Sequence, residues 1–124
     1  MTKLRLDHDG VEQAVRIGKA LDHPLRVRAL AMLRDGELCV CELIEMLGLA
    51  ASTVSKHMSV IADAGIVERR RDGRWTYYSL PNEPDSATEM ALNLVMELVR
   101  DDPAVAEDRS RLAGVGCRTE AIHG

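Results

Sequence analysis

Residues 40–80 read VCELIEMLGLAASTVSKHMSVIADAGIVERRRDGRWTYYSL, and the spacing of apolar residues in this stretch decides the fold. Apolar side chains recur at helical spacing over 40–47 and over about 51–64, and a glycine ends each segment. Two helices joined by a short turn that contains Gly48 form a helix-turn-helix pattern. After Gly65 the spacing becomes an alternation of two, and Asp72-Gly73 is a strong signal for a two-residue hairpin loop. We therefore expect a mainly α fold with a β-hairpin wing, that is, a winged helix-turn-helix.

The flanking segments predict further helices. Residues 9–22 carry apolar side chains at helical spacing, with Asp9 and Glu12 placed like a cap, and Pro24 opens a second helix that the DG at 35 and 36 ends. After Pro81 and Pro84, a last long helix begins with SATE at residues 86–89, which fits a capping box.

The predicted last helix, SATEMALNLVMELVR at residues 86–100, is apolar around most of its circumference. Its polar residues form one narrow stripe, made of Glu89, Asn93, Glu97 and Arg100. One apolar face can cover its own domain, but a chain of 124 residues is too small to enclose the other. We expect a homodimer that pairs through its first and last helices. Residues 1–113 would form one DNA-binding and dimerisation domain, and residues 114–124 a flexible tail.

The composition indicates a soluble protein that works in the cytoplasm. The chain has 46% hydrophobic and 29% charged residues, and it contains neither an apolar run long enough to cross a membrane nor a signal peptide in MTKLRLDHDG. Its net charge is −4, which by itself argues against a nucleic-acid partner. However, basic residues outnumber acidic ones over residues 52–74, whereas residues 83–108 hold eight acidic residues against the single basic residue Arg100.

The second helix of a helix-turn-helix enters the major groove of DNA, with its N-terminal residues nearest the bases. The outward residues there are hydroxyls, a cation and an imidazole, namely Ser52, Thr53, Ser55, Lys56 and His57. An ordinary solvated helix face would have the same pattern, but the arginines of the hairpin favour DNA, and we assign backbone contacts to Arg69, Arg71 and Arg74. A loop at Asp72-Gly73 would place Arg71 directly across from Arg74, and a phosphate between them would relieve their repulsion.

The stretch ELCVCEL, residues 37–43, places two cysteines one residue apart at the start of a predicted helix. Positions two apart on a helix point about 200° away from each other, so Cys39 and Cys41 cannot hold one ion unless the backbone bends. We therefore expect a bound ion to unwind the first turn, over residues 39–43, and to shift this helix against the DNA-reading helix. The unsatisfied N–H groups at a helix N-terminus favour thiolate over thiol at both positions.

Three segments together resemble the ArsR/SmtB family of winged-helix repressors: ALDHPLRVRALAMLRDGELCVCEL, STVSKHMSVIADAGIVERR and RDGRWTYYSL. The resemblance covers about residues 10–100, and it implies a homodimer that represses a metal- or metalloid-resistance operon and leaves its operator DNA when the toxic ion binds. Within that family, Cys39 and Cys41 match the first two ligands of a thiolate site that senses As(III) or Sb(III). The position of the third cysteine of arsenical repressors is occupied by Ile44, so we assign the third ligand to Cys117, the one other cysteine of this sequence.

The sequence also allows other interpretations. The protein could sense another thiophilic metal, such as cadmium, lead or zinc, or it could sense oxidation of the two thiols. The resemblance argues against sensing of these metals. Cadmium and lead sensors of the family add cysteines from an N-terminal arm, and no cysteine precedes Cys39, while zinc sensors that use the last helix need histidines there, and residues 85–102 contain none. A small thiol-redox enzyme that uses CVC is a remote alternative, since no general base or substrate cleft is suggested. We expect no enzyme activity.

Overall fold

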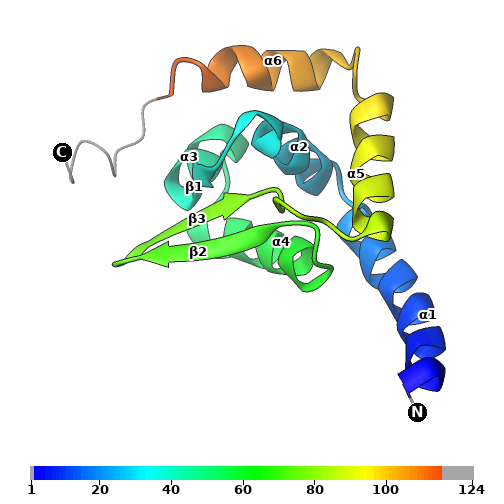
Figure 1. The fold of residues 1–124 in the computed structure, drawn as a ribbon. Coiled ribbons are helices and arrows are strands. Elements are labelled where there is room, and N and C mark those ends of the chain that lie inside the picture. Colours follow the sequence, from blue (N-terminus) through cyan, green and yellow to red (C-terminus); the bar gives the residue numbers. More distant parts are fainter. Residues whose placement is uncertain (1, 116–124) are drawn as a thin grey trace.

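The structure is a computed structural model that describes the backbone of residues 2–115, with side chains from residue 10 onward. The elements follow one another along the chain in Figure 1 as α1 (Thr2–Ala20), α2 (Pro24–Met32), the 3₁₀ helix η1 (Leu33–Asp35), β1 (Leu38–Cys39), α3 (Val40–Leu47), α4 (Ala51–Asp63), β2 (Glu68–Asp72), β3 (Trp75–Ser79), α5 (Ser86–Leu98) and α6 (Pro103–Leu112). The tail predicted at 114–124 falls largely outside the described residues.

The predicted helix-turn-helix is confirmed in α3 and α4. Gly48 ends α3 with a φ of +67°, a left-handed conformation that favours glycine, and Gly65 follows α4 with a φ of +79°. The inner faces of the two helices meet in the main core through fully buried side chains, among them Leu43, Val54 and Ile61. Packing against this shared core fixes the angle at which α4 is presented to solvent.

The predicted hairpin is present, but its loop lies one residue later than expected. Asp72 pairs with Trp75 and Arg71 pairs with Thr76, so the two-residue loop is Gly73-Arg74 rather than Asp72-Gly73. Gly73 has a φ of +63°, and a glycine at the first loop position is the requirement of a type II′ turn. The prediction that Arg71 lies directly across from Arg74 is therefore wrong.

A third strand extends the wing. The short β1 pairs with β3 in antiparallel register, which gives a sheet of order β1-β3-β2. This pairing joins the segment before α3 to the hairpin after α4, although about 38 residues separate Cys39 from its partner Tyr77 along the chain. The wing is thus tied to the start of α3.

Two predicted helix starts are corrected. The helix α1 begins at Thr2 and runs through residues 9–12, so the helix start predicted there from Asp9 and Glu12 is wrong. The helix α5 begins at Ser86, and its cap is Asp85, whose carboxylate accepts from the Thr88 N–H at 2.8 Å, instead of the predicted capping box starting at Ser86.

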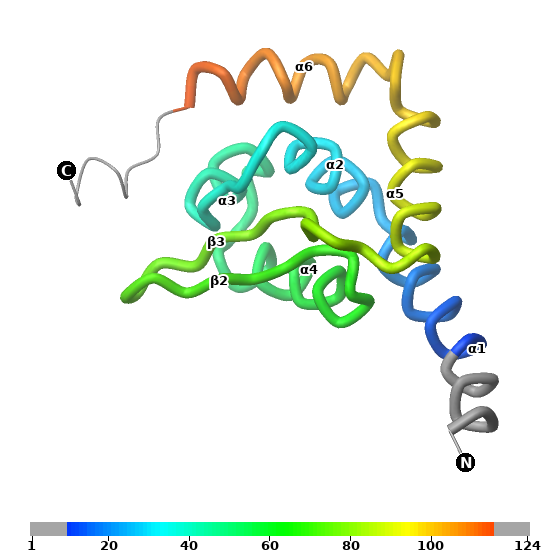
Figure 2. The backbone as a smooth tube through the Cα atoms, in the orientation of Figure 1, coloured from blue at the N-terminus to red at the C-terminus, as the bar shows by residue number. Residues whose placement is uncertain are grey.

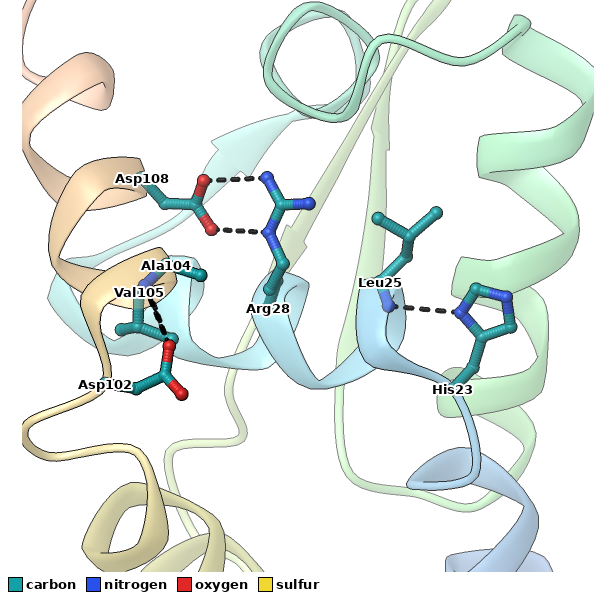
Figure 3. A network of polar contacts seen from close by, with 7 residues as sticks. All are labelled: His23, Leu25, Arg28, Asp102, Ala104, Val105 and Asp108. Atoms are coloured by element: carbon teal, nitrogen blue, oxygen red, sulfur yellow. Dashed lines mark hydrogen bonds and ion pairs between the residues drawn. The ribbon is translucent and has the colours of Figure 1, made fainter.

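The helix α6 was not predicted, because its sequence reads as part of the acidic C-terminal segment and buries little apolar surface. Asp102 caps its first turn, and α6 lies across α2 as Figure 1 shows. Figure 3 shows the ion pair that joins the two helices, in which both nitrogens of the Arg28 fork donate to the Asp108 carboxylate at 2.7 Å. The Asp108 side chain is 4% exposed, whereas the Arg28 side chain is 28% exposed.

Figure 3 also shows His23 capping α2 by accepting from the Leu25 N–H at 3.1 Å.

An apolar surface remains exposed at one end of the domain. Figure 2 shows α5 standing at this end, near the C-terminal part of α1. Gln13 of α1 donates to Asp85 at the start of α5 across 3.3 Å. The large exposed apolar side chains of the described residues all belong to these two helices: Val11, Val15, Met90, Leu94 and Leu98. No helix among the described residues is long and apolar enough to cross a membrane.

Candidate functional site

The two thiols of ELCVCEL lie against each other. Cys39 is the last residue of β1 and the N-cap of α3, with an extended backbone (φ −73°, ψ 148°), and Cys41 is in the first turn of α3. The thiol of Cys41 donates to Cys39 Sγ, and the sulfurs are 2.9 Å apart. The expectation that the two side chains point apart is wrong, because it holds only when both residues are inside the helix.

The start of α3 holds Cys39 in place through a capping box. The Cys41 N–H donates to Cys39 Sγ across 3.4 Å, and the Cys39 N–H donates to Glu42 Oε1 at 2.8 Å. The Cys39 sulfur therefore lies at the N-terminus of α3, where it accepts from the Cys41 N–H. Cys39 is 1% exposed and Cys41 is half-buried, so a ligand would reach the pair from the side of Cys41.

The described residues provide these two sulfurs but no complete ligand set. Within the described part of the chain, no three His, Cys, Asp or Glu side chains are grouped so that they could hold a metal ion. Cys117, the predicted third ligand, lies outside the described residues. Helix α6 contacts α3, and Leu112 and Val115 pack on the same core as Ile44. The described residues end at Val115, two positions before Cys117. A soft donor pair of this kind fits a thiophilic ion.

Four of the predicted DNA-reading residues are exposed at the start of α4, namely Ser52, Thr53, Ser55 and Lys56. Ala50, the N-cap, has no side chain that can accept from the helix, so the first N–H groups of α4 have no side-chain cap. The exposed hydroxyls and these N–H groups are both able to bind phosphate oxygens. Contact between these residues and DNA remains a prediction.

His57 is placed differently from its neighbours on α4. Its Nδ1 lies 3.1 Å from a guanidinium nitrogen of Arg26 on α2, and its ring centroid lies 4.4 Å from that of His23. Burial, together with the nearby His23 and Arg26, lowers the pKa of His57. Because arginine can only donate, Nδ1 of a neutral His57 accepts this hydrogen bond, and the ring helps to seat α4 on α2. A DNA contact through its other nitrogen stays a prediction.

The three consecutive arginines of β2 divide between the two faces of the wing. Alternation along a strand puts Arg69 and Arg71 on one face and Arg70 on the other. Arg69, Arg71 and the loop residue Arg74 are exposed, as phosphate contacts require. Arg70 instead donates to both carboxylate oxygens of Glu37, at 3.0 and 2.7 Å, and its guanidinium lies 4.4 Å from the centre of the Tyr77 ring. The alternation of residues along the strand could have distinguished Arg70 from Arg69 and Arg71 in the sequence. Its partner Glu37 could not be found that way, because the two residues meet only through the pairing of β1 with β3.

The chain is similar in sequence and in fold to known regulators. The profile described as bacterial regulatory protein, arsR family, matches residues 23–69. The arsenic resistance transcriptional regulator ArsR1 of Pseudomonas putida is 36% identical over 104 residues, which are 83% of this chain and 80% of that protein. A homolog of the cadmium resistance regulatory protein CadC from Staphylococcus aureus is 35% identical over 69 residues, which are 55% of this chain and 57% of that protein. The homodimeric winged helix-turn-helix DNA-binding domain Mb0332 of Mycobacterium bovis superposes with a TM-score of 0.63 and 26% identity, over 77% of this chain and 86% of that chain.

Proposed function

Since this chain belongs to the arsR family of bacterial regulatory proteins, we propose that it is a homodimeric repressor that releases operator DNA when As(III) or Sb(III) binds its cysteine thiolates. The family and the relatives are DNA-binding transcriptional regulators, which confirms the prediction that the chain is not an enzyme. The observation that carries the choice of signal is the pair of sulfurs 2.9 Å apart at the start of the helix-turn-helix.

The geometry changes the expected mechanism. An ion can reach both sulfurs without unwinding the first turn of α3, because Cys39 already turns back toward Cys41. With bonds of about 2.3 Å, as in zinc thiolates, one ion holds two sulfurs roughly 3.3 Å apart at a right angle and roughly 3.8 Å apart at a tetrahedral angle. An ion therefore replaces the hydrogen bond between the thiols with a separation and orientation of the sulfurs that its own bonds set, which moves them from their ion-free positions. Because Cys39 is also a strand residue, this movement reaches the backbone that positions the DNA-binding elements.

The donor set supports a metalloid as the signal. Two thiols lie together, with no histidine grouped with them among the described residues, and As(III) or Sb(III) is satisfied by three sulfurs, so Cys117 would complete the site. Sensing of cadmium or a related metal is the second candidate, favoured by the likeness to the CadC homolog. A metal that prefers four ligands would need a further donor beyond the three cysteines of this sequence.

Oxidation of the thiol pair is a further candidate, and the short distance between the sulfurs favours it. A peroxide would convert the half-buried Cys41 thiol to a sulfenic acid with loss of water, and the Cys39 thiol would displace a second water to form the disulfide. The reaction needs no large approach of the two residues, since their sulfurs already touch.

The exposed apolar side chains of α1 and α5 support the proposed dimer. Met90 and Leu98 are 70% and 72% exposed in the single chain, and a second copy would cover them. The related domain Mb0332 is homodimeric. We therefore propose pairing through α1 and α5, while α6, which follows α5, packs on its own subunit. Two copies would present two α4 helices and two wings to one DNA duplex.

The test is release of DNA by arsenite. A duplex selected from a random library by the wild-type protein is labelled, and its binding is followed by fluorescence anisotropy as arsenite is added. We expect Cys39→Ser and Cys41→Ser to bind the duplex as the wild type does but to keep it in arsenite, whereas Cys117→Ser keeps partial release. The proposal fails if the Cys39→Ser/Cys41→Ser double variant leaves the DNA at the wild-type arsenite concentration. Parallel titrations with cadmium and with peroxide distinguish the other two signals.

A further inference from the structure

We propose that Glu37, Arg70 and Tyr77 transmit the state of the Cys39/Cys41 pair to the wing, and that without them the protein binds the ion but keeps its DNA. This inference rests on the proposed function and deepens it. It concerns how the ion acts at a distance, which the two thiols alone leave open.

The first link runs from the sulfurs to strand β1. Cys39 belongs to two elements, since its backbone pairs with Tyr77 of β3 while its side chain caps α3. Toward the helix, the hydrogen bond from its N–H to Glu42 and the packing of α3 in the core resist displacement. Strand β1 is held by its two residue pairs with β3, and both of its residues are buried. A movement of the Cys39 sulfur therefore acts on β1 and on its pairing with β3 as well as on α3.

The second link runs from β1 to the wing through side chains. Cys39, Tyr77 and Arg70 occupy one row across the sheet, because Cys39 pairs with Tyr77 and Tyr77 pairs with Arg70. The Arg70 guanidinium lies over the Tyr77 ring and closes the row by binding Glu37, two residues before Cys39, through both of its carboxylate oxygens. The ion pair thus spans the outer strands of the sheet and passes over the middle one.

The third link is the position of Arg70 among the predicted DNA contacts. Its neighbours Arg69 and Arg71 are exposed on the opposite face of the same strand. When Glu37 moves with β1, its ion pair with Arg70 pulls on the Arg70 side chain, and β2 turns or shifts together with Arg69 and Arg71.

The test separates ion binding from its effect on DNA. Glu37→Gln removes the charge of the fork acceptor, and Arg70→Lys keeps the positive charge but loses the planar fork and the stacking on Tyr77. Glu45→Gln is the matched control, since it makes the same charge change on the exposed surface of α3. For each variant, arsenite binding is measured by the ultraviolet absorption of the thiolate–arsenic bond. Affinity for the selected duplex is measured with and without arsenite.

We expect arsenite binding by Glu37→Gln and Arg70→Lys to stay within about twofold of the wild type. The factor by which arsenite weakens DNA binding, of order a hundredfold in a working switch, should fall at least fivefold in both variants and stay unchanged in Glu45→Gln. An unchanged factor in both variants would overturn the inference, and so would loss of arsenite binding, because these residues would then be part of the site. If the Cys39→Ser/Cys41→Ser protein still responds to arsenite, the proposed function itself fails, and that result is seen without the Glu37 and Arg70 variants.

Discussion

The ion pair between Arg28 and Asp108 holds α6 on the domain, and replacing Asp108 with Asn tests how much stability it contributes. Asparagine has nearly the same volume, so the change removes the charge without opening a cavity. The Asp108 side chain is 4% exposed and accepts both hydrogen bonds of the Arg28 fork at 2.7 Å. The variant leaves Arg28 facing an amide, whose NH₂ group repels a guanidinium and whose single oxygen can accept only part of the fork.

The size of the effect follows from the burial of the two partners. Removing one partner of a fully buried ion pair costs about 3–5 kcal/mol, because the other charge is left uncompensated. Arg28 keeps 28% exposure, so water reaches part of its guanidinium and the cost is lower. We expect the free energy of unfolding to fall by about 2–3 kcal/mol. With a urea dependence of about 2 kcal/mol/M, the unfolding midpoint moves down by roughly 1–1.5 M.

The assay is urea unfolding followed by circular dichroism, at one protein concentration because dimerisation also contributes to stability. The control is Arg109→Ala, which breaks the other ion pair of α6, with Asp35, where both side chains are more than half exposed. Such a surface pair contributes about 0–1 kcal/mol, so its midpoint should barely move. If Asp108→Asn is within about 0.5 kcal/mol of the wild type, or no worse than this control, the ion pair does not anchor α6, and the reasoning from burial is refuted.

Two further predictions concern the dimer and the wing. Leu94 is 55% exposed in the single chain, and Leu94→Glu should weaken dimerisation at least tenfold in sedimentation velocity, since symmetry places the new charge in the interface twice. The control Asn93→Glu, on the polar stripe, should leave dimerisation unchanged. Equal behaviour of the two variants would show that α5 is not part of the interface. The double variant Arg71→Ala/Arg74→Ala should bind all duplexes more weakly and flatten the salt dependence of binding by about 0.9 for each phosphate that the wing no longer binds, and an unchanged slope would show that the wing does not touch DNA.

Local patterns in the sequence were sufficient for most of the helices and for the wing. The helices α3 and α4 were predicted from apolar spacing and from the glycines that end them, and the hairpin from alternation and an Asp-Gly pair. These features depend on backbone preferences and on contacts between residues a few positions apart, which is why the order of residues reveals them. The shared pattern of the segments around ELCVCEL also indicated the family, as the comparisons confirm.

The contacts that shape the candidate site depend on residues far apart in the chain, and only the tertiary structure determines them. Cys39 takes an extended backbone because β1 pairs with β3, and this pairing turns its sulfur toward Cys41 instead of away from it. Glu37 meets Arg70 for the same reason, and α6 is seated by an ion pair across 80 residues. Such contacts form when the packing of the core brings together residues that are far apart in the chain. The spacing and propensities of residues within a short segment do not determine which distant residue each side chain will contact.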